Sequence, residues 1–171
     1  NMPVFSAVTT IGREAFMKAN MTTCDLTTMP KLYSISDWAF ANSTCESVSC
    51  PASLTLIGNL SFWGTNKLRK VTFAENSLLQ SIGLNAFRAN NRHPYLKEVA
   101  LQMELPENLS SISEGAFAET SFYTHCEDGE YSICIPKNVS SIGACAFSSH
   151  NAKIKNFVVD DSLGKIVKGK Y

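Results

Sequence analysis

The chain carries six cysteines and three histidines, the residue types that most often ligate metals or serve as nucleophiles. No two cysteines form a CxxC pair, and His93, His125 and His150 lie far apart in the sequence. A structural zinc site draws about four such ligands from closely spaced motifs. We therefore expect no metal centre, and Glu127, Asp128 and Glu130 lack the spaced ligands of a calcium loop.

Catalytic motifs are missing as well. There is no nucleophile elbow, phosphate-binding loop or HExxH sequence. Cys145 and His150 would form a thiol–imidazole pair only with an orienting partner, and the sequence offers none. We expect a protein that is not an enzyme and that uses no cofactor.

Charge and hydropathy limit the classes of partner that the chain can be expected to bind. Fifteen basic residues balance fifteen acidic ones, whereas nucleic-acid-binding proteins usually show a basic excess or stripe. No segment approaches the roughly 18–20 consecutive apolar residues that span a bilayer. We expect neither nucleic-acid binding nor membrane insertion.

The positions that must arrange any site belong to an internal repeat. The hexapeptide Ile-(Gly/Ser)-x-x-(Ala/Ser)-Phe occurs six times, and a seventh, degenerate copy ends in Tyr171. An aliphatic residue stands three positions before each repeat isoleucine, and an apolar residue stands nine positions before it. The repeat isoleucines are Ile11, Ile35, Ile57, Ile82, Ile112, Ile142 and Ile166.

Each repeat has a physical interpretation. Alternating apolar residues upstream of the isoleucine predict a short strand with one inward face. Gly or Ser after the isoleucine permits a tight bend, and the small Ala or Ser lets a short helical turn pack closely. One unit cannot bury its apolar side alone, whereas stacked units share one continuous core.

These features predict an α/β repeat solenoid resembling a leucine-rich-repeat superhelix of right-handed twist. A parallel sheet would line one face, and short helical or irregular turns would line the other. Residues 1–171 would form a single solenoid domain of about seven repeats, with insertions near 88–95 and 118–131.

The segments 109–117 (LSSISEGAF) and 139–147 (VSSIGACAF), each preceded by an apolar residue and proline, resemble BspA-type leucine-rich repeats. The resemblance extends over nearly the whole chain. It implies a surface or secreted protein, and it implies adhesion to a host matrix protein or another cell-surface molecule.

Candidate ligand-binding residues come from two places. Ten residues before each repeat isoleucine, the outward parity of the strand is polar in every copy, although any solvent-facing strand surface is polar. The insertions add aromatic and arginine residues, which are frequent in binding hot spots, although the second insertion also fits a simple hairpin around Asp128-Gly129. The candidates are Asp25, Ser47, Thr72, Gln102, Ser132, Asn156, Arg92, Tyr95, Tyr123 and Tyr131.

The cysteines allow one structural hypothesis. Cys24 and Cys45 precede their repeat isoleucines by eleven and twelve residues. Neighbouring strands lie about 4.8 Å apart, so the hypothesis is that a disulfide bridges these two cysteines. Cys50 occupies an inward position and is interpreted as a buried core thiol.

Two functions fit the sequence. The first is an extracellular or surface-displayed adhesion module that binds a protein or glycan through its strand face and edge loops. The second is a structural spacer or assembly domain of a larger repeat protein. Ends without capping repeats also predict end-to-end self-association.

Overall fold

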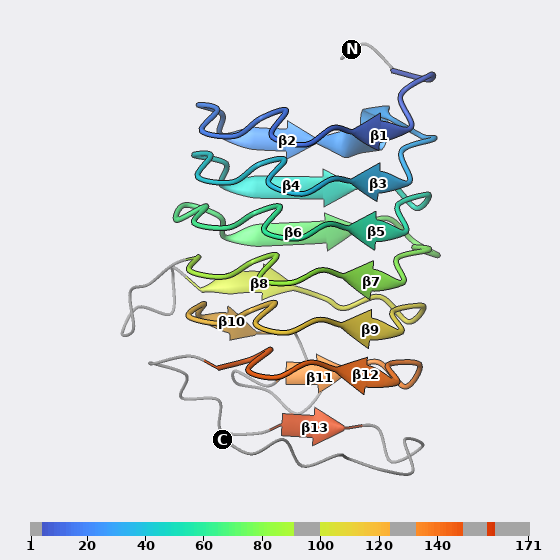
Figure 1. The fold of residues 1–171 in the computed structure, drawn as a ribbon. Helices are drawn as coiled ribbons and strands as arrows, with labels where there is room; N and C mark the ends of the chain where they lie inside the picture. Colours follow the sequence, from blue (N-terminus) through green and yellow to red (C-terminus); the bar gives the residue numbers. More distant parts are fainter. Residues whose placement is uncertain (1–4, 91–99, 124–132, 149–156, 160–171) are drawn as a thin grey trace.

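In the computed structural model, residues 5–90, 100–123, 133–148 and 157–159 are described, and they form a stack of similar coils (Figure 1). Each coil contributes one strand to each of two sides of the stack (Figure 1). Among these residues, no helix is long and apolar enough to cross a membrane. The solenoid expected from the repeats is confirmed.

The repeat isoleucines form one sheet of six parallel two-residue strands. Its order is β1-β3-β5-β7-β9-β12, so every coil pairs with the coil that follows it. Equivalent isoleucines pair directly across it, as Ile35 does with Ile57 and Ile82 with Ile112. This sheet was not predicted, because two residues per coil are too few to show alternation. Its strands are Thr10–Ile11 (β1), Ser34–Ile35 (β3), Leu56–Ile57 (β5), Ser81–Ile82 (β7), Ser111–Ile112 (β9) and Ser141–Ile142 (β12).

The second sheet is the one that the alternating residues predicted. Its five parallel strands follow the order β10-β8-β6-β4-β2. Along β4 the pattern of half-buried and buried residues alternates without interruption, with Val48 and Cys50 inward. Its strands are Thr23–Asp25 (β2), Ser47–Cys50 (β4), Lys70–Phe73 (β6), Leu101–Met103 (β8) and Phe122–Tyr123 (β10).

The second insertion changes the pairing at the end of this sheet. β10 comes from the 118–131 insertion and pairs with β8. The next strand, β11 (Ile133–Ile135), pairs with β13 (Phe157–Val159) in a separate two-stranded sheet. The insertion therefore supplies an extra strand to the five-stranded sheet.

The segment from isoleucine to phenylalanine makes an irregular turn, not a helical one. The third residue after the isoleucine has φ between 51° and 62° in all six coils, and only one of these six residues is glycine. The second residue after the phenylalanine is also left-handed, with φ between 55° and 67° in the five described coils. Alternate turn N–H groups bond to the next coil, as in Phe40 N–H to the Ser61 carbonyl at 2.7 Å, whereas those between them bond within their own turn, as in Ala41 N–H to the Trp38 carbonyl at 3.1 Å. The 3-10 helix η1 (Leu26–Thr28) is the one helix in the described ranges.

The glycine after the isoleucine allows neighbouring coils to stack closely. This role differs from the tight bend that we expected there. The φ of this glycine is not in the left-handed region in any copy. A Cβ built on Gly83 would lie 2.7 Å from the carbonyl carbon of Gly58 in the preceding coil. The position is therefore restricted to small residues by the neighbouring coil.

The core is organised around a column of phenylalanines. Phe16, Phe40, Phe62, Phe87, Phe117 and Phe147 stack with ring centroids 5.0–5.4 Å apart and interplanar angles of 2–12°. Phe62 is fully buried, whereas Phe16 at the end of the column is 37% exposed. The repeat isoleucines from Ile11 to Ile112 and the aliphatic residues from Leu32 to Val139 three positions before the isoleucines fill the rest of the interior, whereas Ile142 is 45% exposed.

Replacing a ring in the middle of the column should destabilise the whole stack. We expect Phe62→Ala to lower the free energy of unfolding by about 3–5 kcal/mol, because it removes a buried aromatic side chain and leaves a cavity between two rings. Phe16→Ala should cost less, since one face of that ring already meets solvent. Urea denaturation monitored by circular dichroism measures both, and equal losses would contradict a column that is continuous through Phe62.

Candidate functional site

The outer face of the five-stranded sheet, here called the strand face, presents two parallel ladders of polar side chains. The register aligns Thr23, Ser47, Lys70, Gln102 and Tyr123 in one ladder. It aligns Asp25, Ser49 and Thr72 in the other. The face is thus a flat surface of hydroxyl, amide and charged groups held by a parallel sheet.

The four described candidates from the polar row lie on this face, but in two ladders and not one. Ser47 and Gln102 share the first ladder, whereas Asp25 and Thr72 share the second. The reason is loop length. Val48 and its register partner Val71 precede their repeat isoleucines by nine and eleven residues respectively. Two extra residues between strand and isoleucine shift the register by two and leave the outward parity unchanged.

Some of these side chains already have structural roles. Asp25 caps η1, where its Oδ1 accepts hydrogen bonds from the backbone N–H and the hydroxyl of Thr27 at 3.0 and 2.5 Å. Thr72 Oγ1 lies 3.2 Å from Ser49 Oγ. These local bonds hold the polar groups in place before any ligand arrives.

Of the insertion candidates, Tyr123 is the one that the structure places. It pairs with Gln102 and continues the first ladder by one strand. This joins an insertion residue to the predicted polar row, a connection that no spacing rule indicated. Arg92, Tyr95, Tyr131, Ser132 and Asn156 lie outside the described residues.

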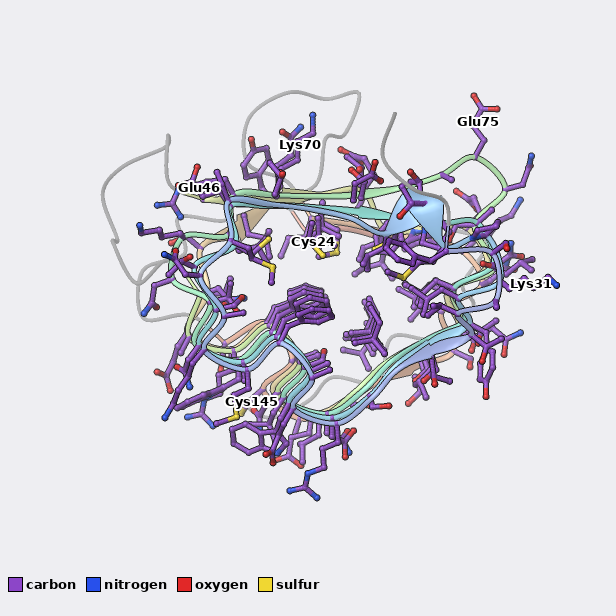
Figure 2. The ribbon with its side chains drawn as sticks, turned by 90° about the horizontal axis from the view of Figure 1, so that it is seen from above. Cys24, Lys31, Glu46, Lys70, Glu75 and Cys145 are labelled. Atoms are coloured by element: carbon purple, nitrogen blue, oxygen red, sulfur yellow. The ribbon has the colours of Figure 1, made fainter. Side chains whose placement is uncertain are left out.

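A second feature lies on the edge of the solenoid that we call the turn edge. In each coil it consists of the residues from the repeat isoleucine to the second residue after the repeat phenylalanine. It contains a hollow of about 350 Å³ that spans three coils. In the axial view of Figure 2, Cys145 of this hollow lies across the solenoid from Lys70 of the strand face. The hollow is lined by Asn85, Arg88, Glu114, Gly115, Ala118, Glu119, Cys145 and Ser148.

The hollow lies where two rows of the turn edge carry small residues. In the row three residues after the isoleucine, Trp38 and Leu60 give way to Gly115 and Cys145 further along. In the row that follows the phenylalanine, Trp63 gives way to Ala118 and Ser148. The sequence patterns did not indicate this site, although the small residues stand out when the repeats are aligned row by row.

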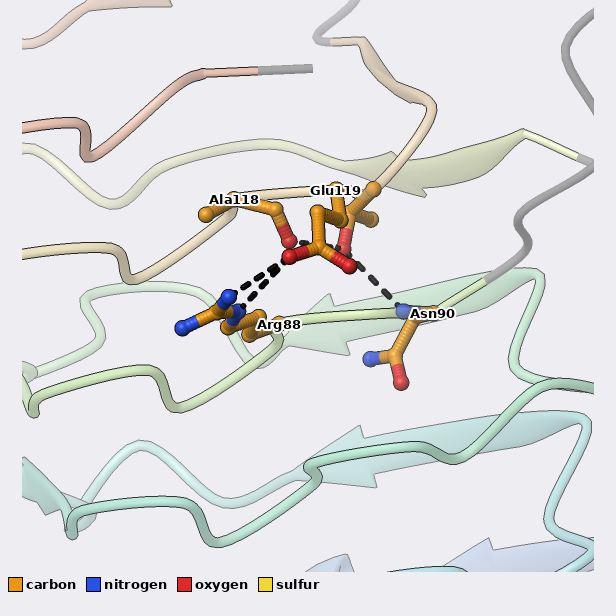
Figure 3. Close-up of polar contacts among 5 residues, drawn as sticks. Arg88, Asn90, Ala118 and Glu119 are labelled. Atoms are coloured by element: carbon orange, nitrogen blue, oxygen red, sulfur yellow. Dashed lines mark hydrogen bonds and ion pairs between the residues drawn. The ribbon is translucent and has the colours of Figure 1, made fainter. Parts of the chain in front are cut away.

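An ion pair crosses one side of the hollow (Figure 3). Arg88 donates from Nη2 and Nε to Glu119 Oε1 at 2.6 and 3.2 Å. The two side chains are 42% and 25% exposed, so solvent screening limits the stabilisation to about 1 kcal/mol or less. With Glu114 added, the lining residues carry one more negative charge than positive.

Aromatic residues continue the turn edge beyond the hollow. Trp38 and Trp63 are half-buried and meet edge to face, with ring centroids 5.8 Å apart. The coil of Trp63 neighbours the coil of Arg88, since Gly64 N–H bonds to the Arg88 carbonyl at 3.0 Å. The two indoles and the hollow therefore lie along one edge of the solenoid.

Side-chain bonds between coils fix this edge. Asp37 Oδ1 accepts a hydrogen bond from the backbone N–H of Asn59 at 2.8 Å, and Asn59 Oδ1 accepts one from Leu84 N–H at 2.8 Å. Both residues stand two positions after their repeat isoleucines. The backbone beside the indoles is thereby tied from coil to coil.

The disulfide that we expected between Cys24 and Cys45 is wrong. Both thiols are free, as are Cys50 and Cys145, whereas Cys134 is disulfide-bonded. Cys24 is aligned with Val48 and not with Cys45, whose Sγ instead lies 3.1 Å from the Ser47 carbonyl oxygen. The interpretation of Cys50 as a buried core thiol is confirmed.

Burial makes these core thiols poor nucleophiles. It raises the pKa of Cys24 to about 12, helped by the neighbouring Cys45 and Asp25. Burial likewise raises the pKa of Cys50 above its ordinary value, and Cys24 adds to this effect. Since the thiolate is the reactive form, the thiols of the strand-face core are inert at neutral pH.

A thiol titration tests this assignment. At pH 8 we expect Cys145, which is exposed, to react quickly with Ellman's reagent in the folded protein. Cys24 and Cys50 should react only on unfolding, because at pH 8 their raised pKa keeps them protonated. Cys145→Ser should remove the fast phase. A native chain in which Cys24 reacts as fast as Cys145 would contradict the burial seen here.

The architecture defines a class, the repeat solenoid of stacked parallel strands. Within that class, the model of the BspA type leucine rich repeat region matches in six copies over residues 9–127 and 100–169. The chain therefore belongs to the BspA-type leucine-rich repeat family.

Solved structures give more distant likenesses. A leucine-rich cell surface protein of Faecalibacterium prausnitzii is 22% identical with a TM-score of 0.33, over 68% of this chain and 40% of that one. The pneumococcal vaccine antigen PcpA is 19% identical with a TM-score of 0.45, over 91% and 37%. A leucine-rich repeat protein of Bacteroides ovatus is 18% identical with a TM-score of 0.40, over 81% and 43%. The chain spans about two-fifths of each of those proteins. No curated protein matches the sequence.

Proposed function

We propose that residues 1–171 form a single solenoid domain that works as a non-enzymatic adhesion module at the cell surface or in the extracellular space. Its ligand is a protein or a glycan, bound through the strand face and the edge loops. Membership of the BspA-type family supports the surface location, because such repeats are typical of surface and secreted proteins.

The observation that carries the proposal is the geometry of the strand face. Five parallel strands carry two ladders of polar side chains whose spacing is set by the backbone. Broad, pre-formed surfaces lose little conformational freedom on binding. Tyr123, joined to the first ladder, adds an amphipathic aromatic side chain of the type enriched in binding hot spots.

A binding screen against matrix proteins, cell-surface receptors and glycans tests this function. For any saturable ligand, we expect the double variant Thr72→Ala/Gln102→Ala to weaken binding at least about tenfold, or about 1.4 kcal/mol. Thr10→Ala removes an exposed hydroxyl from the six-stranded sheet and serves as the matched control. Tyr123→Ala, which removes the insertion's side chain from the first ladder, should also weaken binding.

Two outcomes would contradict the proposal. One is a folded domain that binds nothing in the screen. The other is a ligand whose affinity responds to Thr10→Ala as strongly as to the strand-face variant.

A structural spacer or assembly domain of a larger repeat protein is the second candidate, and the exposed ring of Phe16 favours it, because a further coil from the same protein or from another copy would cover this ring. Phe16 is 37% exposed, although the four rings that follow it are buried. Stacking a second copy against this ring would extend the column and cover an apolar surface. Assembly would then proceed end to end.

Light scattering over a concentration series distinguishes assembly from a solitary module. We expect the mean mass to rise with concentration, and Phe16→Lys should abolish the rise by placing a charge at the end of the column. A strict monomer at high concentration would contradict assembly and leave the adhesion proposal unaffected.

A further inference from the structure

The turn edge has the chemistry of a sugar-binding surface. The hollow combines an amide from Asn85, a guanidinium from Arg88 and carboxylates from Glu114 and Glu119. Planar groups with paired donors or acceptors can engage two adjacent hydroxyl groups at once. Next to it lie the half-buried indoles of Trp38 and Trp63, which meet edge to face and are apolar groups of the kind that pack against the C–H face of a pyranose ring.

We propose that the turn edge binds a neutral, extended oligosaccharide. Consecutive sugar residues would occupy the hollow, which spans three coils, and those that follow would contact Trp63 and then Trp38. This inference rests on the proposed binding function but assigns it a second surface, across the solenoid from the strand face (Figure 2).

The repeat supplies the correct spacing for such a ligand. Successive coils stand 5.0–5.4 Å apart, as measured between the stacked phenylalanine rings. This separation is close to the length of one sugar residue in an extended β-linked chain. An oligosaccharide lying along the solenoid axis would therefore meet an equivalent turn at every sugar.

The charge of the hollow selects neutral sugars. Arg88 is already paired with Glu119, so its positive charge is compensated within the site. Glu114 leaves one excess negative charge among the lining residues. A carboxylated or sulfated sugar would meet this charge at close range, and the repulsion would disfavour it.

Intrinsic fluorescence reports directly on this surface. The chain has two tryptophans, and both lie on the turn edge. We would titrate the full chain with chitohexaose and cellohexaose as neutral probes, and with sialyllactose as an anionic comparator, and confirm affinities by calorimetry. We expect a saturable change in tryptophan emission with at least one neutral hexasaccharide and none with sialyllactose.

A variant that fills the hollow locates the site without removing any contact of the core. Ser148 is exposed and follows its repeat phenylalanine, which is the position that Trp63 occupies three coils earlier. Because the fold already accepts tryptophan there, Ser148→Trp should fold, and it should weaken hexasaccharide binding at least tenfold. Trp63→Ala should weaken it similarly, whereas Tyr33→Ala, which removes an exposed aromatic ring before β3, should not.

Several outcomes would overturn the proposal. These are no fluorescence or heat change with either neutral hexasaccharide at millimolar concentration, equal binding of sialyllactose, or binding that survives Ser148→Trp. A protein ligand lost on Ser148→Trp without any hexasaccharide binding would assign the edge to a protein. The two proposals can fail separately, because Thr72 and Gln102 lie on the other surface. If no hexasaccharide binds but another ligand binds through Thr72 and Gln102, the adhesion proposal stands and this one fails.

Discussion

The structure depends on one constraint: the backbone N–H and C=O groups of every coil must find hydrogen-bond partners in the neighbouring coils. Turn N–H groups that a helix would pair internally are donated between coils instead, at Phe40, Phe62, Phe87 and Phe117 among others. This is possible only if successive coils superpose by translation, and the stacked phenylalanines show that they do. The left-handed residues are part of the same solution. A non-glycine residue there costs about 1–2 kcal/mol, and the hydrogen bonds and ring stacking of the next coil offset it.

The same constraint determines where the chain can vary. Repeat isoleucines are separated by between 22 and 30 residues, yet the ring separations along the phenylalanine column stay within 5.0–5.4 Å. Extra residues are absorbed outside the stacked positions, in η1 after β2 and in the insertions. Even β10, which enters from an insertion, joins the existing sheet in parallel register. Functional variation is therefore confined to outward side chains and loops.

Sequence patterns predicted the parts of the fold that repeat. They failed where contacts with neighbouring coils determine the backbone conformation, the strand register or the pairing of cysteines. The periodic isoleucine and phenylalanine indicated the solenoid because each of them must enter the core. The turn was not predictable, since Trp38, Leu60 and Cys145 at φ of 52–59° carry no local signal for left-handed backbone. The polar row was assigned to the correct face but to one ladder, because the register depends on loop length. The expected Cys24–Cys45 bridge failed for the same reason, as spacing from the isoleucine does not place two cysteines side by side.

The turn edge shows how such a scaffold acquires a second surface without changing its core. Gly115, Ala118, Cys145 and Ser148 line the hollow, and the phenylalanine rings of their coils remain stacked beside it. The size of each residue could be read from aligned repeats. The pairing of Arg88 with Glu119 could not, because it joins residues 31 positions apart that become neighbours only across the long first insertion. The charge left on the hollow thus follows from the stacking of coils, as the shape of the rest of the molecule does.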